Sequence, residues 1–228
     1  MDELRRTHNN AKRNFIKSVA ARGDLVLDVG CGRGGDLHKW KHAGVHLWGI
    51  DPDAESIKEA QERAKGMNYR AFFDVGDVHA AGIGPYDLVC YNFSLQYIFK
   101  SEQLFKSGIA DIARRVKHGG YFVGVVPDAE KILKLPCQWS DSLGNTITRG
   151  PSIGKGNIGE MILVQLADGP YYAKGPVPEP LCYREKLVAE VEAWGFCLQQ
   201  WKDMLPEQTG LVSDIYSTFI FRKIVPSY

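Results

Sequence analysis

Several features that would mark other protein classes are missing from this 228-residue sequence. No apolar run approaches the ~20 residues of a membrane-spanning helix, and no charged-then-apolar leader opens the chain, so we expect neither a membrane segment nor a signal peptide. The five cysteines lie far apart and include no C-x-x-C pair, which argues against a disulfide framework and a structural zinc site and fits a reducing, intracellular compartment. The formal net charge of +1 argues against a chain that is basic throughout, as many nucleic-acid-binding proteins are.

Two local clusters of side chains suggest binding sites, and each also has a simpler interpretation. His38 and His42 share one helix face at a spacing compatible with zinc, but no third ligand accompanies them, so we predict no metal site. Basic residues gather near the N-terminus, where they form either a binding patch or the solvated face of a helix. These residues are Arg5, Arg6, Lys12, Arg13, Lys17 and Arg22.

The chain from about residue 25 to 127 alternates short apolar runs with helical patterns. Expected strands cover residues 25–29, 45–50, 69–75, 86–91 and 121–126. Expected helices cover residues 4–21, the stretch from the glycine loop to about 43, 54–65 and 102–116. This alternation predicts an α/β fold with a Rossmann-like, doubly wound, mostly parallel sheet, in a single domain over residues 1–228.

The pattern changes after Pro127. Residues 136–159 are rich in Gly, Ser and Pro and are expected to form a long loop, which in a compact domain is more often functional than idle. Residues 160–166 and 171–172 are expected to form a hairpin inserted over the C-terminal edge of the sheet. A helix over 183–194 and strands over 196–201 and 215–224 complete the chain, so the sheet is expected to end in an antiparallel strand pair.

A glycine-rich segment, Asp28-Val-Gly-Cys-Gly-Arg-Gly-Gly-Asp36, follows the first expected strand. Glycines between a strand and its helix let the backbone approach a ligand closely, and Gly30, Gly32 and Gly34 meet that need. Asp51, at the end of the next strand, is positioned to accept hydrogen bonds from two ribose hydroxyls. The segment also satisfies G-x-G-x-x-G, so the glycine pattern alone leaves both a nicotinamide enzyme and a methyltransferase open.

Three features favour the methyltransferase. Asp28, directly before the loop, is positioned to anchor the glycine turn and the charged end of a methionine moiety. Asp77, after the third strand, is positioned to read an adenine amino group together with the backbone N–H of Val78. The chain also closes with a strand pair rather than another helix–strand crossover. Because Asp28, Asp51 and Asp77 all lie at strand ends on one rim, where ligands of such sheets bind, the sequence predicts an S-adenosylmethionine site.

Further segments resemble one family, the mRNA cap guanine-N7 methyltransferases, through most of the chain. Residues 5–12 resemble its R-x-x-N-N-x-x-K segment, and residues 27–37 resemble its L-D-L-G-C-G-K-G-G-D-L loop. Residues 92–97 resemble its Q-F-x-x-H-Y motif. Val177-Pro-Glu179, in a Pro-rich loop, resembles its V-P-E, and Ile215-Tyr216 resembles the start of its closing strand. The occurrence of these motifs in this order is strongly specific.

The resemblance implies a role for each site residue. The cofactor-binding group is Lys12, Asp28, Gly30, Gly32, Asp36, Asp51, Asp77, Val78 and Asn92. The cap-binding group is Asn9, Arg33, Phe93, Gln96, Tyr97, Glu179 and Tyr216. In this second group, Glu179 is expected to accept from guanine N1–H and the exocyclic amine, and Arg33 to meet the triphosphate. Gln96, which stands where the family has histidine, is expected to donate to guanine O6, and the aromatic residues to supply flat faces for stacking.

The implied reaction needs no acid or base among the side chains. Guanine N7 carries a lone pair and no proton, so we expect kcat to be nearly flat around neutral pH. The expected partners are capped RNA and, because the chain begins almost at the first motif, other capping domains of the same polypeptide. A viral capping enzyme is one hypothesis, with action in the host cytoplasm or the virion; a cellular protein would act in the nucleus. Two alternatives stay open: a methyltransferase for a small molecule or a protein, and a catalytically silent scaffold.

Overall fold

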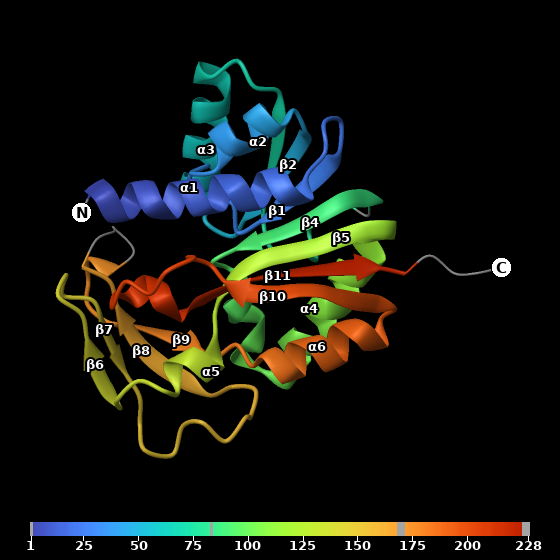
Figure 1. Ribbon diagram of the computed structural model, residues 1–228. Coiled ribbons are helices and arrows are strands. Elements are labelled where there is room, and N and C mark those ends of the chain that lie inside the picture. The colour runs from blue at the N-terminus through green and yellow to red at the C-terminus, as the bar shows by residue number, and fades with distance from the viewer. Residues whose placement is uncertain (1, 83, 168–171, 225–228) are drawn as a thin grey trace.

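A seven-stranded sheet forms the centre of the fold in the computed structural model, which describes residues 2–82, 84–167 and 172–224 (Figure 1). The strand order is β10-β11-β5-β4-β1-β2-β3, with β1 to β5 parallel and β11 antiparallel to both neighbours. The strands are β1 (Leu25–Val29), β2 (His46–Asp51), β3 (Ala71–Val75), β4 (Tyr86–Asn92), β5 (Val116–Pro127), β10 (Phe196–Asp203) and β11 (Tyr216–Lys223). The expected parallel sheet with an antiparallel end is confirmed.

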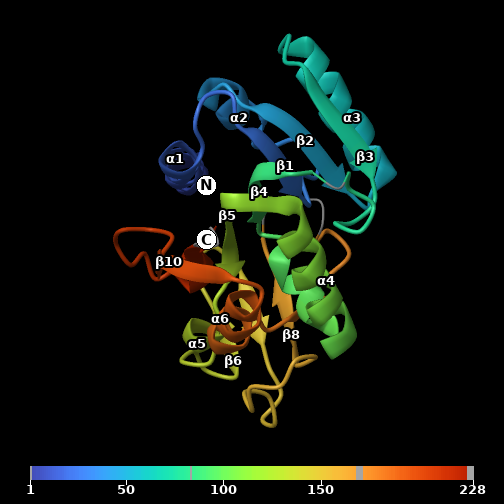
Figure 2. The ribbon, with the colours of Figure 1, turned by 90° about the vertical axis from the view of Figure 1, so that its right-hand side faces the viewer.

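Helices cover both faces of this sheet (Figure 1, Figure 2). One face carries α1 (Asp2–Val19), α2 (Leu37–Ala43) and α3 (Ala54–Gly66), and the other carries α4 (Glu102–Arg115) and α6 (Arg184–Ala193). The expected amphipathic helix α1 buries Phe15 and Ile16 in one cluster with Val26 and Leu88, which fixes it across β1 and β4. The side chains of residues 2–5, Arg5 among them, lie outside the described part of the chain. Of the described helices, none has the length and apolar content to cross a membrane.

Capping residues fix several element boundaries. Asp53 caps the start of α3 and Ser101 the start of α4, each by accepting a hydrogen bond from the backbone N–H three residues later. The helix expected over 102–116 ends at Arg115, one residue early, and β5 begins at once at Val116. The strand expected over 121–126 therefore starts several residues earlier than predicted and includes Gly119 and Gly120.

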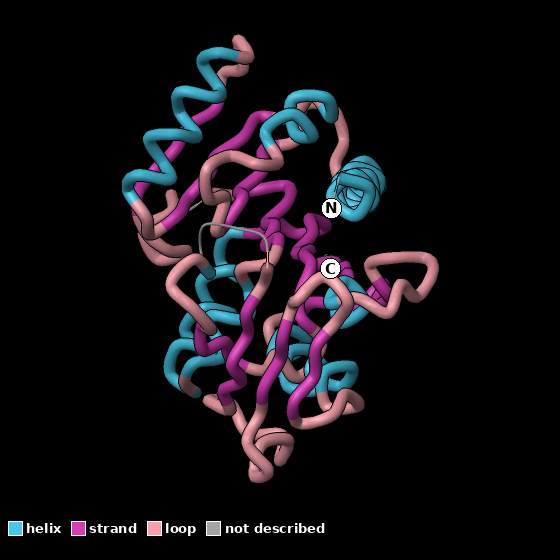
Figure 3. Tube along the Cα trace, turned by 90° about the vertical axis from the view of Figure 1, so that its left-hand side faces the viewer, coloured by secondary structure: helices cyan, strands magenta, loops and turns pink. Residues whose placement is uncertain are grey.

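The insertion after β5 is larger than the single hairpin expected from the sequence. It is a four-stranded antiparallel sheet in the order β6-β7-β8-β9, seen below the main sheet in Figure 3. Its strands are β6 (Gln138–Ser140), β7 (Thr146–Thr148), β8 (Met161–Gln165) and β9 (Val177–Pro180). The expected loop at 136–159 therefore contains two strands. Of the expected hairpin partner at 171–172, Tyr171 lies outside the described residues and Tyr172 is in no strand. The strand that pairs with β8 is β9 instead.

The strand order reverses between β1 and β4. From β1 the chain moves outward to β2 and β3 on one side and then returns to β4 and β5 on the other. In sheets of this kind, ligands bind beyond the carboxyl ends of the strands beside such a reversal. The glycine loop follows β1 and Phe93 follows β4, so both lie at that point.

Candidate functional site

The glycine loop between β1 and α2 has a backbone that favours glycine. Gly30, Gly32 and Gly34 have φ angles of 74°, 52° and 74°. A Cβ atom on Gly30 would lie 2.3 Å from the Cβ of Ser94, whereas one on Gly32 would meet nothing within 4 Å. Packing therefore requires Gly30 to be glycine, and the open side of Gly32 gives a ligand access to the loop backbone.

Asp51 ends β2 directly beside this loop. Its Oδ2 accepts from the N–H of Gly32 at 2.9 Å, and its Oδ1 accepts from the N–H of Asp53 at 2.9 Å. A carboxylate offers about four acceptor sites, so about two remain for other donors. Because Asp51 is only half-buried, those sites are accessible to a pair of ribose hydroxyls.

A largely buried polar network ties α1 to the loop and to β4. The carboxylate of Asp36 lies 2.7 Å from Nζ of Lys12 and 2.7 Å from Nζ of Lys39, and Nδ2 of Asn92 donates to it at 3.2 Å. Lys39 also donates to Asn9 Oδ1 at 3.1 Å. Burial raises the pKa of Asp36, but the two lysines outweigh it and hold the pKa below its usual range. Four residues of the expected site thus meet around Lys39, which was not among the expected site residues.

Asp28 lies beneath the glycine loop, where its side chain is 4% exposed. Its Oδ2 accepts from the indole N–H of Trp40 at 2.9 Å. Among the described residues, the side-chain hydrogen bond of Asp28 is therefore with α2 and not with the glycine turn, which it was expected to anchor. Burial, followed by the nearby charge of Asp36, raises the pKa of Asp28 to about 7.

Asp28→Asn is expected to flatten the pH dependence of stability of the cofactor-free protein. Asp28 ionises near pH 4 in the unfolded chain and about pH 7 in the fold, so the folded protein loses stability as the pH rises between these values. The amide keeps an oxygen for Trp40 and carries no charge. The free energy of unfolding is measured with urea at about pH 5 and about pH 8. Its decrease between these pH values is expected to be smaller in the variant than in wild type, by roughly 3 kcal/mol. Parallel pH dependences for the two proteins would contradict this.

Asp77 and Val78 open the loop that follows β3. Asp77 is exposed and its Oδ1 accepts from the backbone N–H two residues later at 2.9 Å, while Val78 is buried. The N–H of Gly76 donates to the carbonyl of Asp51 at 3.0 Å, so the loop starts next to the ribose-binding candidate. Arg115 of α4 donates to two carbonyls of the same loop at 3.0 and 2.9 Å. Asp51 and Asp77 therefore lie along one edge of the sheet.

The groups at this edge fit S-adenosylmethionine. Oδ1 of Asn92 is buried and has no hydrogen-bond partner among the described residues, so it is available to a ligand donor such as the methionine ammonium group. Asp51 keeps acceptor sites for the ribose, and Lys12 carries a positive charge suited to the methionine carboxylate. The residues that would hold the cofactor are thus already positioned by the protein's own contacts.

Phe93, directly after β4, joins this edge to a second group of residues. Its φ of 63° is rare for an aromatic residue. Its ring meets that of Tyr216 edge-on, with 4.8 Å between the ring centroids, and Nζ of Lys12 lies 5.6 Å from its centre. Strain of this kind persists where surrounding contacts enforce it, and it clusters at functional sites.

Glu179 is the buried acid of this second group. It lies in β9 and is 6% exposed, so the expected Pro-rich loop is in fact a strand. Its Oε1 accepts from the hydroxyl of Tyr172 at 2.5 Å, and its Oε2 accepts from Nε2 of Gln96 at 3.5 Å. Burial raises the pKa of Glu179, although both donors favour the ionised form. Burial of Tyr216 raises the pKa of its hydroxyl, and the nearby charge of Glu179 raises it further.

Gln96 lies in the short helix η1 (Leu95–Lys100) and is buried. Its Nε2 donates to the carbonyl of Phe93 at 3.1 Å as well as to Glu179, whereas its Oε1 is buried without a partner in the described part of the chain. Both N–H groups of the amide are therefore in use. The expected donation to guanine O6 requires Gln96 to exchange its long bond to Glu179.

Two members of the expected cap-binding group, Arg33 and Tyr97, lie at the margin of the residues around Glu179. Arg33 is 54% exposed and pairs with Glu59 of α3 at 3.3 Å. Tyr97 is half-buried in η1, with Nζ of Lys100 5.2 Å from its ring centre. Tyr172, in contrast, contacts Glu179 and belongs to the group, although it was expected only as part of a hairpin strand. Its only sequence signal is its nearness to the V-P-E motif.

Comparisons with known proteins agree with the resemblance seen in the sequence. Residues 2–149 match the model of the mRNA (guanine-N(7))-methyltransferase domain. The chain is 34% identical over 165 residues to the mRNA cap guanine-N(7) methyltransferase of Saccharomyces cerevisiae, covering 64% of this chain and 38% of that protein. It is 32% identical over 148 residues to mRNA cap guanine-N(7) methyltransferase 1 of Oryza sativa, covering 58% of this chain and 40% of that protein. The chain thus spans about two fifths of these relatives.

Solved structures support the fold. The CcbJ methyltransferase of Streptomyces caelestis matches with a TM-score of 0.70 at 14% identity, covering 96% of this chain and 90% of that one. An S-adenosylmethionine-dependent methyltransferase of Clostridium acetobutylicum matches with a TM-score of 0.64 at 13% identity, covering 96% and 92%. The family-model match covers more than half of the sequence and includes the glycine loop, the Asp51 edge and η1. The chain therefore belongs to the mRNA (guanine-N(7))-methyltransferase domain family.

Proposed function

We propose that this protein methylates N7 of the guanine in a GpppN RNA cap. The observation that carries the proposal is the buried carboxylate of Glu179, which lies beside Tyr216 and accepts from Gln96 of η1. This short helix follows β4, and Ser94 directly before it donates to the carbonyl of Val29 at the start of the glycine loop. A carboxylate that accepts two hydrogen bonds matches guanine N1–H and its exocyclic amine. Phe93 contacts both the Lys12 network and Tyr216, so the cofactor side and the guanine side adjoin.

The side chains act by binding and orientation rather than by proton transfer. S-adenosylmethionine, when bound, supplies the methyl group, which passes to the N7 lone pair while the electrons of the broken carbon–sulfur bond stay on sulfur. Holding N7 in line with that methyl group is an entropic advantage that reaches about 7–11 kcal/mol in well-oriented systems. Glu179 adds an electrostatic contribution, because its negative charge favours the positive charge that develops on the purine. No proton is removed from N7, so no general base is required.

The pH dependence is expected to show one acidic limb. Only ionised Glu179 accepts from both guanine N–H groups, and burial raises its pKa, so kcat/KM for GpppA is expected to fall as the pH is lowered through that raised pKa. No second limb is expected on the basic side near neutrality, and kcat itself should stay nearly flat. Steady-state kinetics across mildly acidic to mildly basic pH measures both. A bell-shaped kcat/KM profile would reveal a general base and contradict the proposed mechanism.

A panel of methyl acceptors tests the proposed substrate. Transfer from labelled S-adenosylmethionine is expected with GpppA and GpppG, weaker with GTP, and absent with RNA that has no cap. Transfer to a small molecule or a protein, with none to the caps, would support the alternative substrate class. Cofactor binding without transfer to any acceptor would indicate a silent scaffold.

The proposed reaction also implies partners and a location. Capped RNA is the proposed substrate, with other capping domains as proposed neighbours in a longer polypeptide. The relatives compared above come from a fungus and a plant, which favours an intracellular, nuclear site of action. The viral alternative stays a prediction, and detection of the natural protein in nuclear or cytoplasmic fractions distinguishes the two.

A further inference from the structure

We propose that Tyr172 is a positioning residue for guanine recognition, whose hydroxyl fixes the Glu179 carboxylate in the orientation that receives the guanine edge. The proposal rests on the proposed cap methyltransferase function. Tyr172 neither belongs to the expected motifs nor lies in a strand. Its hydroxyl donates to Oε1 of Glu179 at 2.5 Å, whereas Nε2 of Gln96 lies 3.5 Å from the other oxygen of this carboxylate.

The acceptor sites of the carboxylate support a positioning role. A carboxylate has about four acceptor sites, and Tyr172 and Gln96 use one on each oxygen of Glu179, which leaves about two. Guanine presents two donors on one edge, N1–H and the exocyclic amine. The close contact of Tyr172 therefore fixes one oxygen of the carboxylate, Gln96 lies at the hydrogen-bond limit from the other, and the acceptors that the base needs stay available.

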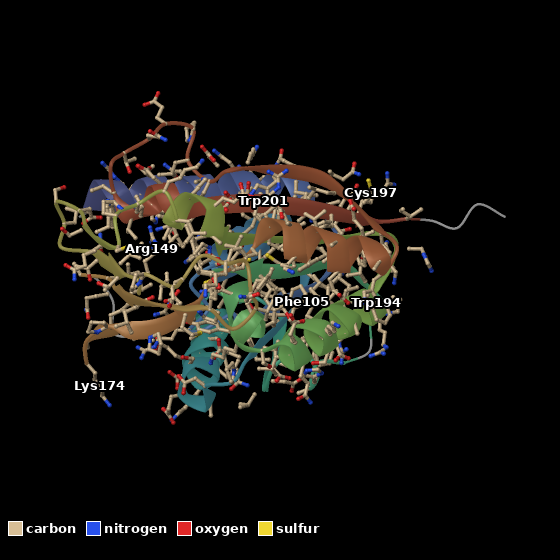
Figure 4. The ribbon with its side chains drawn as sticks, turned by 90° about the horizontal axis from the view of Figure 1, so that it is seen from below. Phe105, Arg149, Lys174, Trp194, Cys197 and Trp201 are labelled. Carbon is tan, nitrogen blue, oxygen red and sulfur yellow. The ribbon has the colours of Figure 1, made fainter. Side chains whose placement is uncertain are left out.

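The turn that carries Tyr172 is held at its backbone. The carbonyl of Tyr172 accepts from Nε2 of Gln165 in β8 at 3.0 Å and from the N–H of Gly175 at 3.1 Å. The ring is partly buried against a hydrophobic cluster that contains residues of both sheets. Two residues later the side chain of Lys174 points away from the molecule (Figure 4), so the turn lies at the surface while the Tyr172 hydroxyl reaches Glu179 inside.

The groups that face Glu179 make its ionisation sensitive to Tyr172. They come from three elements: the Tyr172 turn, η1 with Gln96, and β11 with Tyr216. In the described ranges of the chain, no lysine or arginine forms an ion pair with Glu179. The negative charge of Glu179 is therefore stabilised by hydrogen-bond donors, and loss of the stronger donor disfavours the ionised form.

Tyr172→Phe tests the proposal, with Tyr183→Phe as the matched control. Tyr183 also donates its hydroxyl to a glutamate, Glu160, but away from this group. Tyr172→Phe is expected to move the acidic limb of kcat/KM for GpppA upward by on the order of one pH unit, with cofactor affinity unchanged. Tyr183→Phe is expected to leave the limb in its wild-type position. Thermal unfolding of both variants controls for folding.

A second readout is independent of activity. Carboxyl ¹³C titration of protein labelled at glutamate, with the Glu179 signal assigned by its loss in Glu179→Gln, is expected to show the same upward shift in Tyr172→Phe only. The proposal would be overturned if, in Tyr172→Phe, neither the Glu179 titration nor the acidic limb of kcat/KM moved from its wild-type position. So would a higher kcat/KM in Tyr172→Phe, since the hydroxyl would then compete with guanine for Glu179. If wild type methylates no cap, the proposed function fails, while the titration still reports whether Tyr172 controls Glu179.

Discussion

Glu179→Gln is expected to lower kcat/KM for GpppA by at least about tenfold and up to several hundredfold. The substitution keeps the volume but turns one acceptor oxygen into a donor that faces a donor of guanine. A buried polar group without a partner costs about 1–3 kcal/mol, and the negative charge that favours the transition state is lost as well. Glu179 is 6% exposed, so solvent cannot replace the lost acceptor.

An inosine-capped dinucleotide makes this test specific to the guanine edge. Inosine lacks the exocyclic amine, so wild type is expected to discriminate against it and Glu179→Gln is not. Affinity for S-adenosylhomocysteine, measured by calorimetry, is expected to stay unchanged, because the contacts of Glu179 in the described residues are with Tyr172 and Gln96 and not with the glycine loop. Full activity, or wild-type discrimination, in the variant would show that Glu179 does not bind the base.

Asp51→Ala is expected to weaken S-adenosylhomocysteine binding by at least about a hundredfold. A hydrogen bond to a charged acceptor contributes about 1.5–3 kcal/mol, and the variant loses the acceptor for two ribose hydroxyls. It also loses the bond from the N–H of Gly32 at 2.9 Å, which shapes the glycine loop. Both effects reduce cofactor affinity, and isothermal calorimetry measures the sum.

Asp53→Ala is the matched control for this variant. Asp53 is an exposed carboxylate two residues away, and its side chain caps α3 by accepting from Ser56. Its loss is expected to lower stability slightly, because α3 loses its N-terminal cap, and to leave cofactor affinity nearly unchanged. Equal loss of cofactor affinity in Asp51→Ala and Asp53→Ala would mean that the effect comes from a change in the loop fold. Unchanged affinity in Asp51→Ala would show that Asp51 does not bind the cofactor.

The cofactor half of the fold was predictable because its signals are local. Leu25–Val29 is a buried apolar run, and Gly30 and Gly32 follow it directly in conformations that favour glycine. Asp51 ends the next strand, and the carboxyl ends of parallel strands meet at one edge. Short sequence windows therefore contain the signals that predict these elements.

The insertion was less predictable because its strands are short and depend on distant partners. Val177–Pro180 contains two prolines, which argue for a loop. It forms an edge strand nevertheless, since β9 has one neighbour, β8, and an edge strand tolerates residues that lack an N–H. The β6 and β7 strands have three residues each, too few for an alternating pattern to be recognised.

The partners of the site residues were the least predictable part. Asp28 pairs with Trp40 and Glu179 with Tyr172 and Gln96, and the last pair is separated by 83 positions. No periodicity links such residues, so only the folded chain brings them together. The pKa of Asp28, raised to about 7, follows from the same burial and was likewise invisible in the sequence.

Location of the transferred methyl group is the most direct test of the central claim. The protein is incubated with methyl-labelled S-adenosylmethionine and GpppA, and the digested product is compared with authentic 7-methylguanosine and 2′-O-methyladenosine caps. All of the label is expected at guanine N7. Label on a ribose hydroxyl or on adenine, or no label on the cap by a protein that binds the cofactor, would contradict the proposed function.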